Sequence, residues 1–465
     1  MTVHAPSLDD AASPTEPAAP PVIQPWPTAA SAWWCVFMLS IVLMLSQIDR
    51  NIITLLVAPI KRDLRLTDFQ VGLFGPAFMV LYIFMGLPLS RLTDTRSRRV
   101  MITIGLTFWS LATAACGLAH TFTQLFLARV GIGAGESVNG PATYSLLSDN
   151  FSRERLPRAL ATLNIGFVVG TGFSLVVGGL IIGFLAASPT YDLPLVGTIR
   201  SWQLVFIAVG LPGLVAAALM MTVAEPARRG LAGERPKAPP VSEVVAFLSR
   251  NRRFYGSMIG GIALTSLLAS GVQYWGPTFY QRTFGWSARE VGLWSGTVSL
   301  IGSLIGLFIG PWLTERLNRK YDDGNLRVTV LAYVVAIPFQ IAGPLMPSPW
   351  LALACSGVSF AGTMAATTPY VAALQSVTPN QMRAQISALY LFVFSGIGLG
   401  LGSVLFGAIT DLVVRDEHNI RFTLAGAAAV MAPLAVLIIS RARVPFGRAI
   451  AALKAAEAGP SPGGA

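Results

Sequence analysis

The chain has 465 residues, of which 53% are hydrophobic and only 12% are charged, and its mean hydropathy is +0.62. Because soluble proteins carry roughly a quarter charged residues, this composition indicates a membrane protein and excludes soluble enzymes, disordered proteins and disulfide-rich secreted scaffolds. The basic residues behind the net charge of +11 lie in a few short segments between apolar runs. That distribution indicates membrane topology, so we expect no nucleic-acid partner.

The first predicted element is a tail, residues 1–30, with seven prolines and no Lys or Arg. We expect it to be disordered, because it cannot bury enough apolar surface to fold. A membrane-spanning helix needs about 20 mostly apolar residues. Residues 31–224 contain six runs of this kind, at 33–57, 69–89, 100–119, 125–147, 159–187 and 202–223.

A polar segment, residues 225–253, follows these runs. It holds seven basic residues and is rich in Pro and Gly, which is typical of a linker. Six more apolar runs lie within residues 254–442, before a polar tail at 443–465; they are 254–280, 291–313, 328–344, 350–377, 384–414 and 422–439. The sequence therefore predicts an all-α membrane protein with twelve transmembrane helices in two six-helix halves.

The basic residues also predict how these helices are oriented. If the N-terminus is cytoplasmic, the cytoplasmic segments hold 23 Lys and Arg and the segments on the opposite side hold 8. Because Lys and Arg are retained on the cytoplasmic side, we expect both termini and the linker to be cytoplasmic.

The two halves are related in sequence. Residues 70–74 (Gln-Val-Gly-Leu-Phe) are similar to residues 290–294 (Glu-Val-Gly-Leu-Trp), and Pro141 of the fourth span corresponds to Pro369 of the tenth. In membrane proteins built from repeats, the working site lies at the repeat interface. We therefore expect a site between the halves.

Two motifs resemble those of the major facilitator superfamily. Segment 90–99 keeps Asp94, Arg98 and Arg99 of the signature Gly-x-x-x-Asp-Arg-x-Gly-Arg-Arg, but has Ser at both glycine positions and Thr at the middle Arg. In the fourth span, segment 129–135 matches Arg-x-x-x-Gly-x-Gly. The resemblance implies a monomeric transporter of that fold.

More narrowly, the chain resembles the Spinster family of bacterial type. The resemblance rests on four segments: Gln-Ile-Asp-Arg at 47–50, Ala-Pro-Ile-Lys at 58–61, Gly-Glu-Ser at 135–137 and Asp-Asn-Phe-Ser-Arg-Glu-Arg at 149–155. It implies proton-coupled transport of a lysophospholipid or sphingoid-base phosphate by alternating access, in the inner membrane of a bacterium. The implied partners are a lipid-like small molecule, protons and membrane lipid. The alternative is a drug or organic-anion carrier on the same scaffold.

Four ionisable residues lie deep within the predicted spans: Asp49, Arg50, Arg129 and Glu136. A charge at mid-membrane costs about 2.5 to 3.5 kcal/mol, so such residues normally face a cavity and carry function. The corresponding positions of the second half are not ionisable; they are Ala269, Ser270, Gly357 and Met364. Charges that served the fold alone would be expected in both halves, so we expect a functional role.

The residue types suggest how these four charges act. We expect Asp49 or Glu136 to carry the coupled proton, because burial favours the neutral carboxyl while a nearby Arg favours the carboxylate. We expect Arg50, with Arg129 beside it, to contact a substrate phosphate, because Arg binds phosphate oxygens in a bidentate manner. Cross-pairing of Asp49 with Arg129, or of Arg50 with Glu136, would leave the group nearly neutral.

Two further sets of residues are predicted to take part in transport. Uncharged polar and aromatic residues of the second half suit an acyl chain with a small polar head: Gln273, Tyr274, Trp275, Thr367, Tyr370 and Tyr390. A cytoplasmic gate is predicted from exposed charges, whose pairs are worth about 0 to 1 kcal/mol each: Asp94, Arg98, Arg99, Arg155, Arg158 and Glu315. Rows of glycine in the fifth, eighth and eleventh spans predict close helix packing near the gates.

Other classes of function find little support. The sequence has no Walker loop, GxSxG turn, His or Cys cluster or paired catalytic acids, so we expect no enzymatic activity, no cofactor and no metal site. Cys35, Cys116 and Cys355 lie singly in apolar runs and are predicted to pack. A receptor that does not transport is the remaining class.

Overall fold

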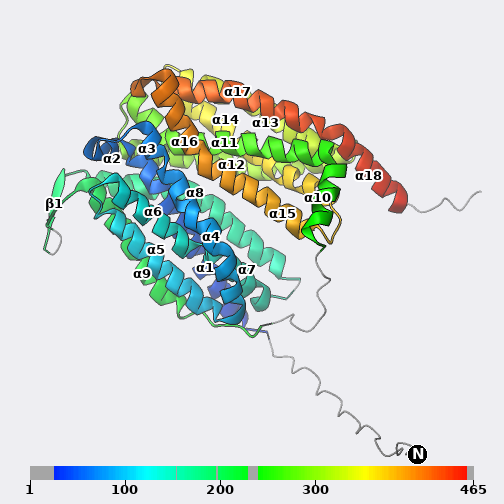
Figure 1. The fold of residues 1–465 in the computed structure, drawn as a ribbon, viewed down its shortest axis with the longest axis horizontal. Coiled ribbons are helices and arrows are strands. Elements are labelled where there is room, and N and C mark those ends of the chain that lie inside the picture. Colours follow the sequence, from blue (N-terminus) through cyan, green and yellow to red (C-terminus); the bar gives the residue numbers. More distant parts are fainter. Residues whose placement is uncertain (1–25, 153, 195–196, 229–238, 458–465) are drawn as a thin grey trace, which may run out of the picture.

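The computed structural model describes residues 26–152, 154–194, 197–228 and 239–457, and these form two helical bundles side by side (Figure 1). The first half contains α1 (Ala29–Leu55), α2 (Val57–Leu64), α3 (Asp68–Gly72), α4 (Phe74–Thr95), α5 (Arg98–Cys116), α6 (Phe122–Glu136), α7 (Asn139–Asn150), α8 (Leu156–Leu185) and α9 (Ser201–Met220). Residues 1–25 of the predicted tail lie outside the described part, and α1 begins before the tail was expected to end.

The second half follows α10 (Val241–Arg250), a helix within the predicted linker. It contains α11 (Arg252–Phe284), α12 (Ala288–Asn318), α13 (Gly324–Ala342), η1 (Gly343–Leu345), α14 (Pro349–Ser376), α15 (Arg383–Leu391), η2 (Phe392–Leu399), α16 (Gly400–Ile409), η3 (Thr410–Val414), η4 (Glu417–Asn419), α17 (Ile420–Arg441) and α18 (Arg443–Glu457). Part of the predicted linker is thus helical, and Val244 of α10 is buried against α11. Residues 229–238 of the linker and 458–465 of the last tail lie outside the described part.

Eleven segments of the described chain are helical, long and apolar enough to cross a membrane. The remaining predicted span, the fourth, is divided into α6 and α7, which are 15 and 12 residues long. Pro141 accounts for the division. It has no N–H for the carbonyl of Ser137, and its ring clashes with that carbonyl in a regular helix, so Ser137 and Val138 form a turn.

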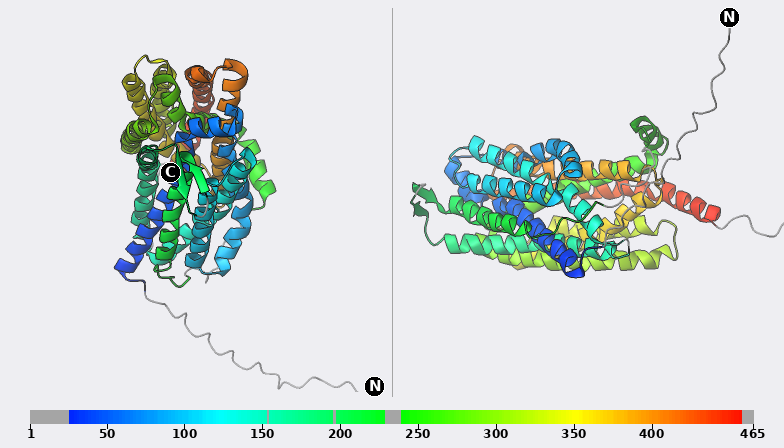
Figure 2. Two further views of the ribbon diagram at one scale, coloured as in Figure 1. Left: turned by 90° about the vertical axis from the view of Figure 1, so that its left-hand side faces the viewer. Right: turned by 90° about the horizontal axis from the view of Figure 1, so that it is seen from below.

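Two short strands depart from the predicted all-α structure. β1 (Thr190–Leu193) pairs antiparallel with β2 (Gly197–Arg200), and Gly197 has a φ of +81°, a conformation that favours glycine. The hairpin projects from one end of the bundle, which we call the hairpin end (Figures 1 and 2). The opposite end, where α1 begins and α10 lies, is called the tail end.

The two halves pack tightly near the hairpin end through glycines of α8 and α12. A Cβ atom at Gly292 would lie 2.4 Å from the carbonyl oxygen of Leu175, and one at Gly296 would lie 2.8 Å from that of Gly172. The predicted close packing is therefore confirmed at this contact. Within the described residues, the hydrogen bonds that join helices of one half to the other all lie toward the hairpin end, and the halves diverge toward the tail end (Figure 1).

Candidate functional site

Arg50 and Glu136 form a buried ion pair inside the first half. Arg50 Nε donates a 3.0 Å hydrogen bond to Glu136 Oε2, and Ser46 Oγ donates to the same oxygen at 2.8 Å. The Glu136 side chain is 1% exposed and the Arg50 side chain 29% exposed, and the Arg50 guanidinium lies 4.4 Å from the Phe78 ring centroid. The predicted pairing of Arg50 with Glu136 is confirmed, and Arg50 is the accessible member of the pair.

Asp49 and Arg129 are both buried, but the structure does not join their side chains in a salt bridge. Arg129 Nη1 donates a 2.8 Å hydrogen bond to the main-chain oxygen of Asp49 instead. Trp109 and Thr113 of α5 lie beside the Asp49 carboxylate. Among the described residues, no hydrogen bond reaches Asp49 Oδ1, Arg129 Nε, Trp109 Nε1 or Thr113 Oγ1. The predicted Asp49–Arg129 pair is therefore corrected to a hydrogen bond from the Arg129 side chain to the Asp49 main chain.

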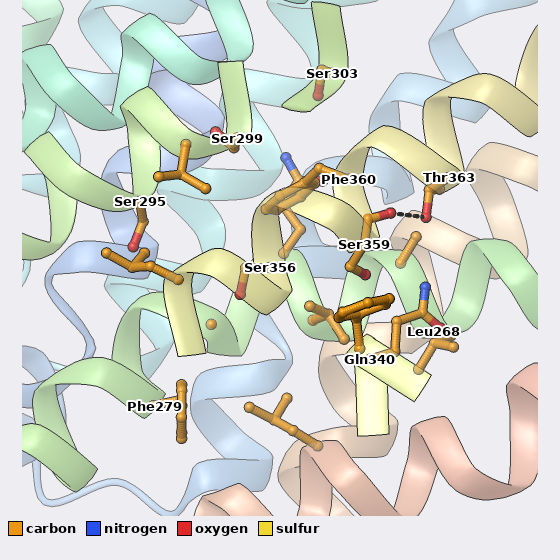
Figure 3. Close-up of a pocket in the computed structure, with 18 of the residues that line it drawn as sticks. Leu268, Phe279, Ser295, Ser299, Ser303, Gln340, Ser356, Ser359, Phe360 and Thr363 are labelled. Atoms are coloured by element: carbon orange, nitrogen blue, oxygen red, sulfur yellow. Dashed lines mark hydrogen bonds between the residues drawn. The ribbon is translucent and has the colours of Figure 1, made fainter. Parts of the chain in front are cut away.

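A cavity of about 230 Å³ lies mainly in the second half, between α11, α12 and α14, with α8 at one side (Figure 3). None of the described residues that line it is Asp, Glu, Lys, Arg or His. The hydroxyl groups in its wall include those of Ser295, Ser299 and Ser303, spaced four residues apart on one face of α12, and others from α14 opposite. The aromatic rings of Phe279 and Phe360 form part of the cavity wall. The cavity therefore suits an apolar group with weak hydrogen-bonding capacity.

Two amide side chains of α1, on either side of Asp49 and Arg50 in sequence, reach residues that line the cavity. Gln47 Nε2 donates a 2.8 Å hydrogen bond to Oγ1 of Thr171, which lines the cavity. Asn51 accepts a 3.3 Å hydrogen bond from Gln273, another lining residue, and donates to Ser174 Oγ at 2.9 Å. Sequence reasoning missed Gln47 and Asn51. Buried amides one helical turn apart in an apolar span were the signal that could have found them.

Of the predicted substrate residues in α11, Gln273 lines the cavity, and Tyr274 and Trp275 do not. Tyr274 donates a hydrogen bond to the main-chain oxygen of Val71, and Trp275 donates one to that of Ser403, each at 2.8 Å. Both side chains are buried, toward the hairpin end. Successive helical residues point about 100° apart, so α11 presents one of the three to the cavity.

The other three predicted substrate residues also lie away from the cavity lining. Thr367 donates to the Thr363 oxygen of its own helix. Tyr370 donates to the main-chain oxygen of Met258, and Tyr390 stacks on Phe394 with ring centroids 6.0 Å apart. Of these interactions, the hydrogen bond of Tyr370 joins α14 to α11.

The predicted gate residues Arg98 and Arg99 hold parts of the first half together. Arg98 is fully buried, with Nε 2.8 Å from Glu225 Oε1 and Nη1 paired with Asp149. Arg99 donates its main-chain N–H to Glu225 Oε2 at 2.9 Å. The prediction that these charges are exposed is wrong for Arg98, because two acids distant in sequence enclose it. Burial alone would raise the pKa of Glu225, but hydrogen bonds from Arg98, Arg99 and Ser97 hold it below its ordinary value.

The remaining predicted gate residues are not brought together. Arg155, Arg158 and Glu315 are exposed, and no ion pair joins them within the described residues. Asp94 belongs to α4, but its side chain lies outside what the structure describes.

The helices of the described chain define a polytopic membrane protein. The profile of the Major Facilitator Superfamily matches residues 39–403, and the chain belongs to that family. The chain is 28% identical over 390 residues to an MFS-type efflux pump of Mycolicibacterium smegmatis, covering 83% of this chain and 86% of that protein. It is 21% identical over 401 residues to Protein spinster of Drosophila melanogaster, covering 84% of this chain and 64% of that protein.

A solved structure confirms the predicted major facilitator fold. It is a bacterial homolog of the human lysosomal transporter Spinster in an inward-facing and unoccupied conformation, with a TM-score of 0.73 and 23% sequence identity. The match covers 91% of this chain and 98% of that one. The predicted resemblance to the Spinster family is likewise confirmed.

Proposed function

We propose that this transporter is a proton-coupled carrier of an amphipathic anion, of the lysophospholipid or sphingoid-base phosphate class, that works by alternating access. One observation carries the proposal: the first half holds a cluster of buried charges, and no Asp, Glu, Lys, Arg or His is among the described residues that line the cavity in the second half. An amphipathic anion has the matching division, with a charged head and an apolar chain.

In this proposal the head binds at Arg50 and the chain enters the cavity. Arg50 is the partly exposed cation of the cluster, and its planar guanidinium matches phosphate oxygens. Each methylene group transferred into an apolar site contributes about 0.8 kcal/mol, so an acyl chain supplies most of the affinity. Asn51, next to Arg50 in sequence, accepts a hydrogen bond from Gln273 of the cavity lining.

Proton coupling follows from the charge balance of the cluster. Asp49, Arg50, Arg129 and Glu136 sum to zero when all are ionised. Uptake of one proton by Asp49 or Glu136 leaves a net charge of +1, which favours binding of an anion. Protonation of Glu136 also weakens its hold on Arg50 and frees the guanidinium for a phosphate. Proton and substrate binding are thereby linked.

The proposed topology uses the basic asymmetry of the sequence. The tail end faces the cytoplasm, and the hairpin end faces outward from a bacterial inner membrane. The basic asymmetry likewise predicts that segments 1–30, 225–253 and 443–465 are cytoplasmic. The halves at 31–224 and 254–442 then move about the central site, and the present conformation, closed at the hairpin end, is inward-facing. The carrier works as a monomer.

A drug or organic-anion carrier is the second candidate function. The similarity to an MFS-type efflux pump, at a higher identity than the similarity to Protein spinster, favours it. Both candidates use the same cavity and differ in the chain length and charge of the substrate.

Flux measurements in reconstituted vesicles separate the candidates. The purified chain is placed in lipid vesicles, and uptake is measured for a labelled lysophospholipid, a sphingoid-base phosphate and a small hydrophilic organic anion, with and without a proton gradient. Albumin outside the vesicles extracts lipid that has not been transported. We expect the gradient to drive accumulation of the two amphipathic anions only. Accumulation of the hydrophilic anion alone would favour the second candidate, and flux indifferent to protons would overturn the coupling.

A further inference from the structure

Four charged side chains join the two halves at the hairpin end. Lys61 of α2 and Asp68 of α3 belong to the first half, and Arg282 of α11 and Glu417 of η4 belong to the second. Asp68 accepts hydrogen bonds from two nitrogens of Arg282, at 2.7 and 2.8 Å, and from Lys61 at 2.8 Å. Glu417 pairs with Lys61 and lies 3.6 Å from Arg282. Each acid contacts both bases, so the four residues form a closed ring, called here the four-charge ring.

The ring is built into the closed interface between the halves. The Asp68 side chain is 0% exposed and that of Arg282 is 9% exposed, while Lys61 and Glu417 lie at the rim. Next to the ring, Asp411 of η3 accepts hydrogen bonds from the main-chain N–H groups of Asp68 and Phe69. The second half thus caps the first turn of α3, and any opening at this end must separate these groups.

Separation of a buried ion pair normally leaves each charge without a partner, which is strongly destabilising. The four-charge ring avoids this cost because of how its members are distributed. If the halves part, Lys61 keeps Asp68 within the first half, and Arg282 keeps Glu417 within the second. Only the ion pairs that cross between the halves, Asp68–Arg282 and Lys61–Glu417, are broken, and no charge is left alone.

We propose that the four-charge ring is the gate at the hairpin end, in which the charges exchange partners between a closed ring and two separate pairs. The closed state has two more ion pairs than the open state and is favoured, while the open state stays accessible. The proposal rests on alternating access in the proposed function, but it concerns residues remote from the charged cluster and the cavity.

Reversal of one pair tests the gate. The double variant Lys61→Asp with Asp68→Lys keeps an ion pair within the first half but presents like charges to Arg282 and Glu417. It should therefore destabilise the closed state and leave the open state intact. The matching double variant Arg282→Glu with Glu417→Arg should have the same effect. Combination of all four changes restores opposite charges at every position of the ring and should restore closure.

Conformation is measured by the distance between two spin labels, one on each half at the hairpin end. Labels are attached to cysteines at the exposed positions His120 and Pro347, after replacement of the three native cysteines by alanine. We expect each double variant to raise the ratio of open to closed molecules about tenfold or more, and the fourfold variant to return it to the wild-type value.

The milder variant Lys61→Gln covers the case in which the fourfold variant does not fold. It leaves Asp68 paired with Arg282 in the closed state but removes the cation that would keep Asp68 paired when the halves part, so it should lower the open fraction, opposite to the reversals. Unchanged distances in both reversed pairs would overturn the gate. The distances are read without substrate or proton gradient, so this failure is distinct from a failure of the proposed transport.

Discussion

Replacement of Arg50 separates a structural from a functional role of the buried ion pair. Arg50→Ala leaves the Glu136 carboxylate, whose side chain is 1% exposed, without its cation. Removal of one partner of a buried pair costs about 3 to 5 kcal/mol, so this variant should be clearly destabilised. The double variant Arg50→Gln with Glu136→Gln removes both charges and should recover most of the lost stability.

Substrate binding should follow a different order from stability. A charge-assisted hydrogen bond contributes about 1.5 to 3 kcal/mol, so both variants should bind a phosphate-bearing substrate about 10- to 150-fold more weakly. A dephosphorylated analogue should bind nearly as before. Ser46→Ala is the matched control: it removes one hydrogen bond to Glu136, keeps both charges, and should leave the preference for phosphate intact.

The assays are thermal unfolding of the purified variants and equilibrium binding of the phosphate-bearing substrate beside its dephosphorylated analogue. If the double variant regained stability and still preferred the phosphate, Arg50 would not be the anion contact. If Arg50→Ala were as stable as the wild type, the carboxylate of Glu136 would not need its cation and the charge argument would fail.

Three other predictions concern packing, pH and topology. Hydrogen bonds hold the pKa of the Glu225 carboxyl below its ordinary value of 4.5. The stabilising effect of this carboxylate should therefore be complete above pH 4.5 and be lost as the pH falls through the lowered pKa. The melting temperature of Glu225→Gln should be lower than that of the wild type at about pH 7, and the difference should shrink in acid. Gly292→Ala crowds the backbone of the other half and should slow transport with little loss of stability. Gly302→Ala crowds α14 within the same half and should lower the melting temperature. Equal changes of transport rate and melting temperature in the two variants would contradict this account. In intact cells, an impermeant thiol reagent should label a cysteine at Thr198 on the hairpin and spare one at Ser249; the reverse pattern would invert the topology.

The sequence predicted the helices better than the side-chain directions. Long apolar runs were sufficient for eleven of the spans in the described chain. The division of the fourth span was not predicted, although Pro141 supplies its physical cause. The hairpin of β1 and β2 was missed because eight strand residues between two long apolar runs resemble a loop.

Buried charges in apolar spans were predictable, and charges near span ends were not. Arg50 and Glu136 stand out because a charge in the membrane needs a partner. Arg98, Asp68 and Arg282 lie where solvated residues are common, so only the structure shows that each is buried in an ion pair. The position of the cavity depends on the rotation of each helix about its axis, which a hydropathy pattern does not fix.

The central claim is that a buried carboxylate of the charged cluster couples proton movement to transport. The most direct measurement compares two fluxes in vesicles for Glu136→Gln and Asp49→Asn: accumulation driven by a proton gradient, and exchange of labelled for unlabelled substrate without a gradient. We predict that at least one variant loses accumulation and keeps exchange, because a permanently neutral group still lets the carrier alternate. Full proton-driven accumulation by both variants would contradict the account and leave the cluster with a structural role only.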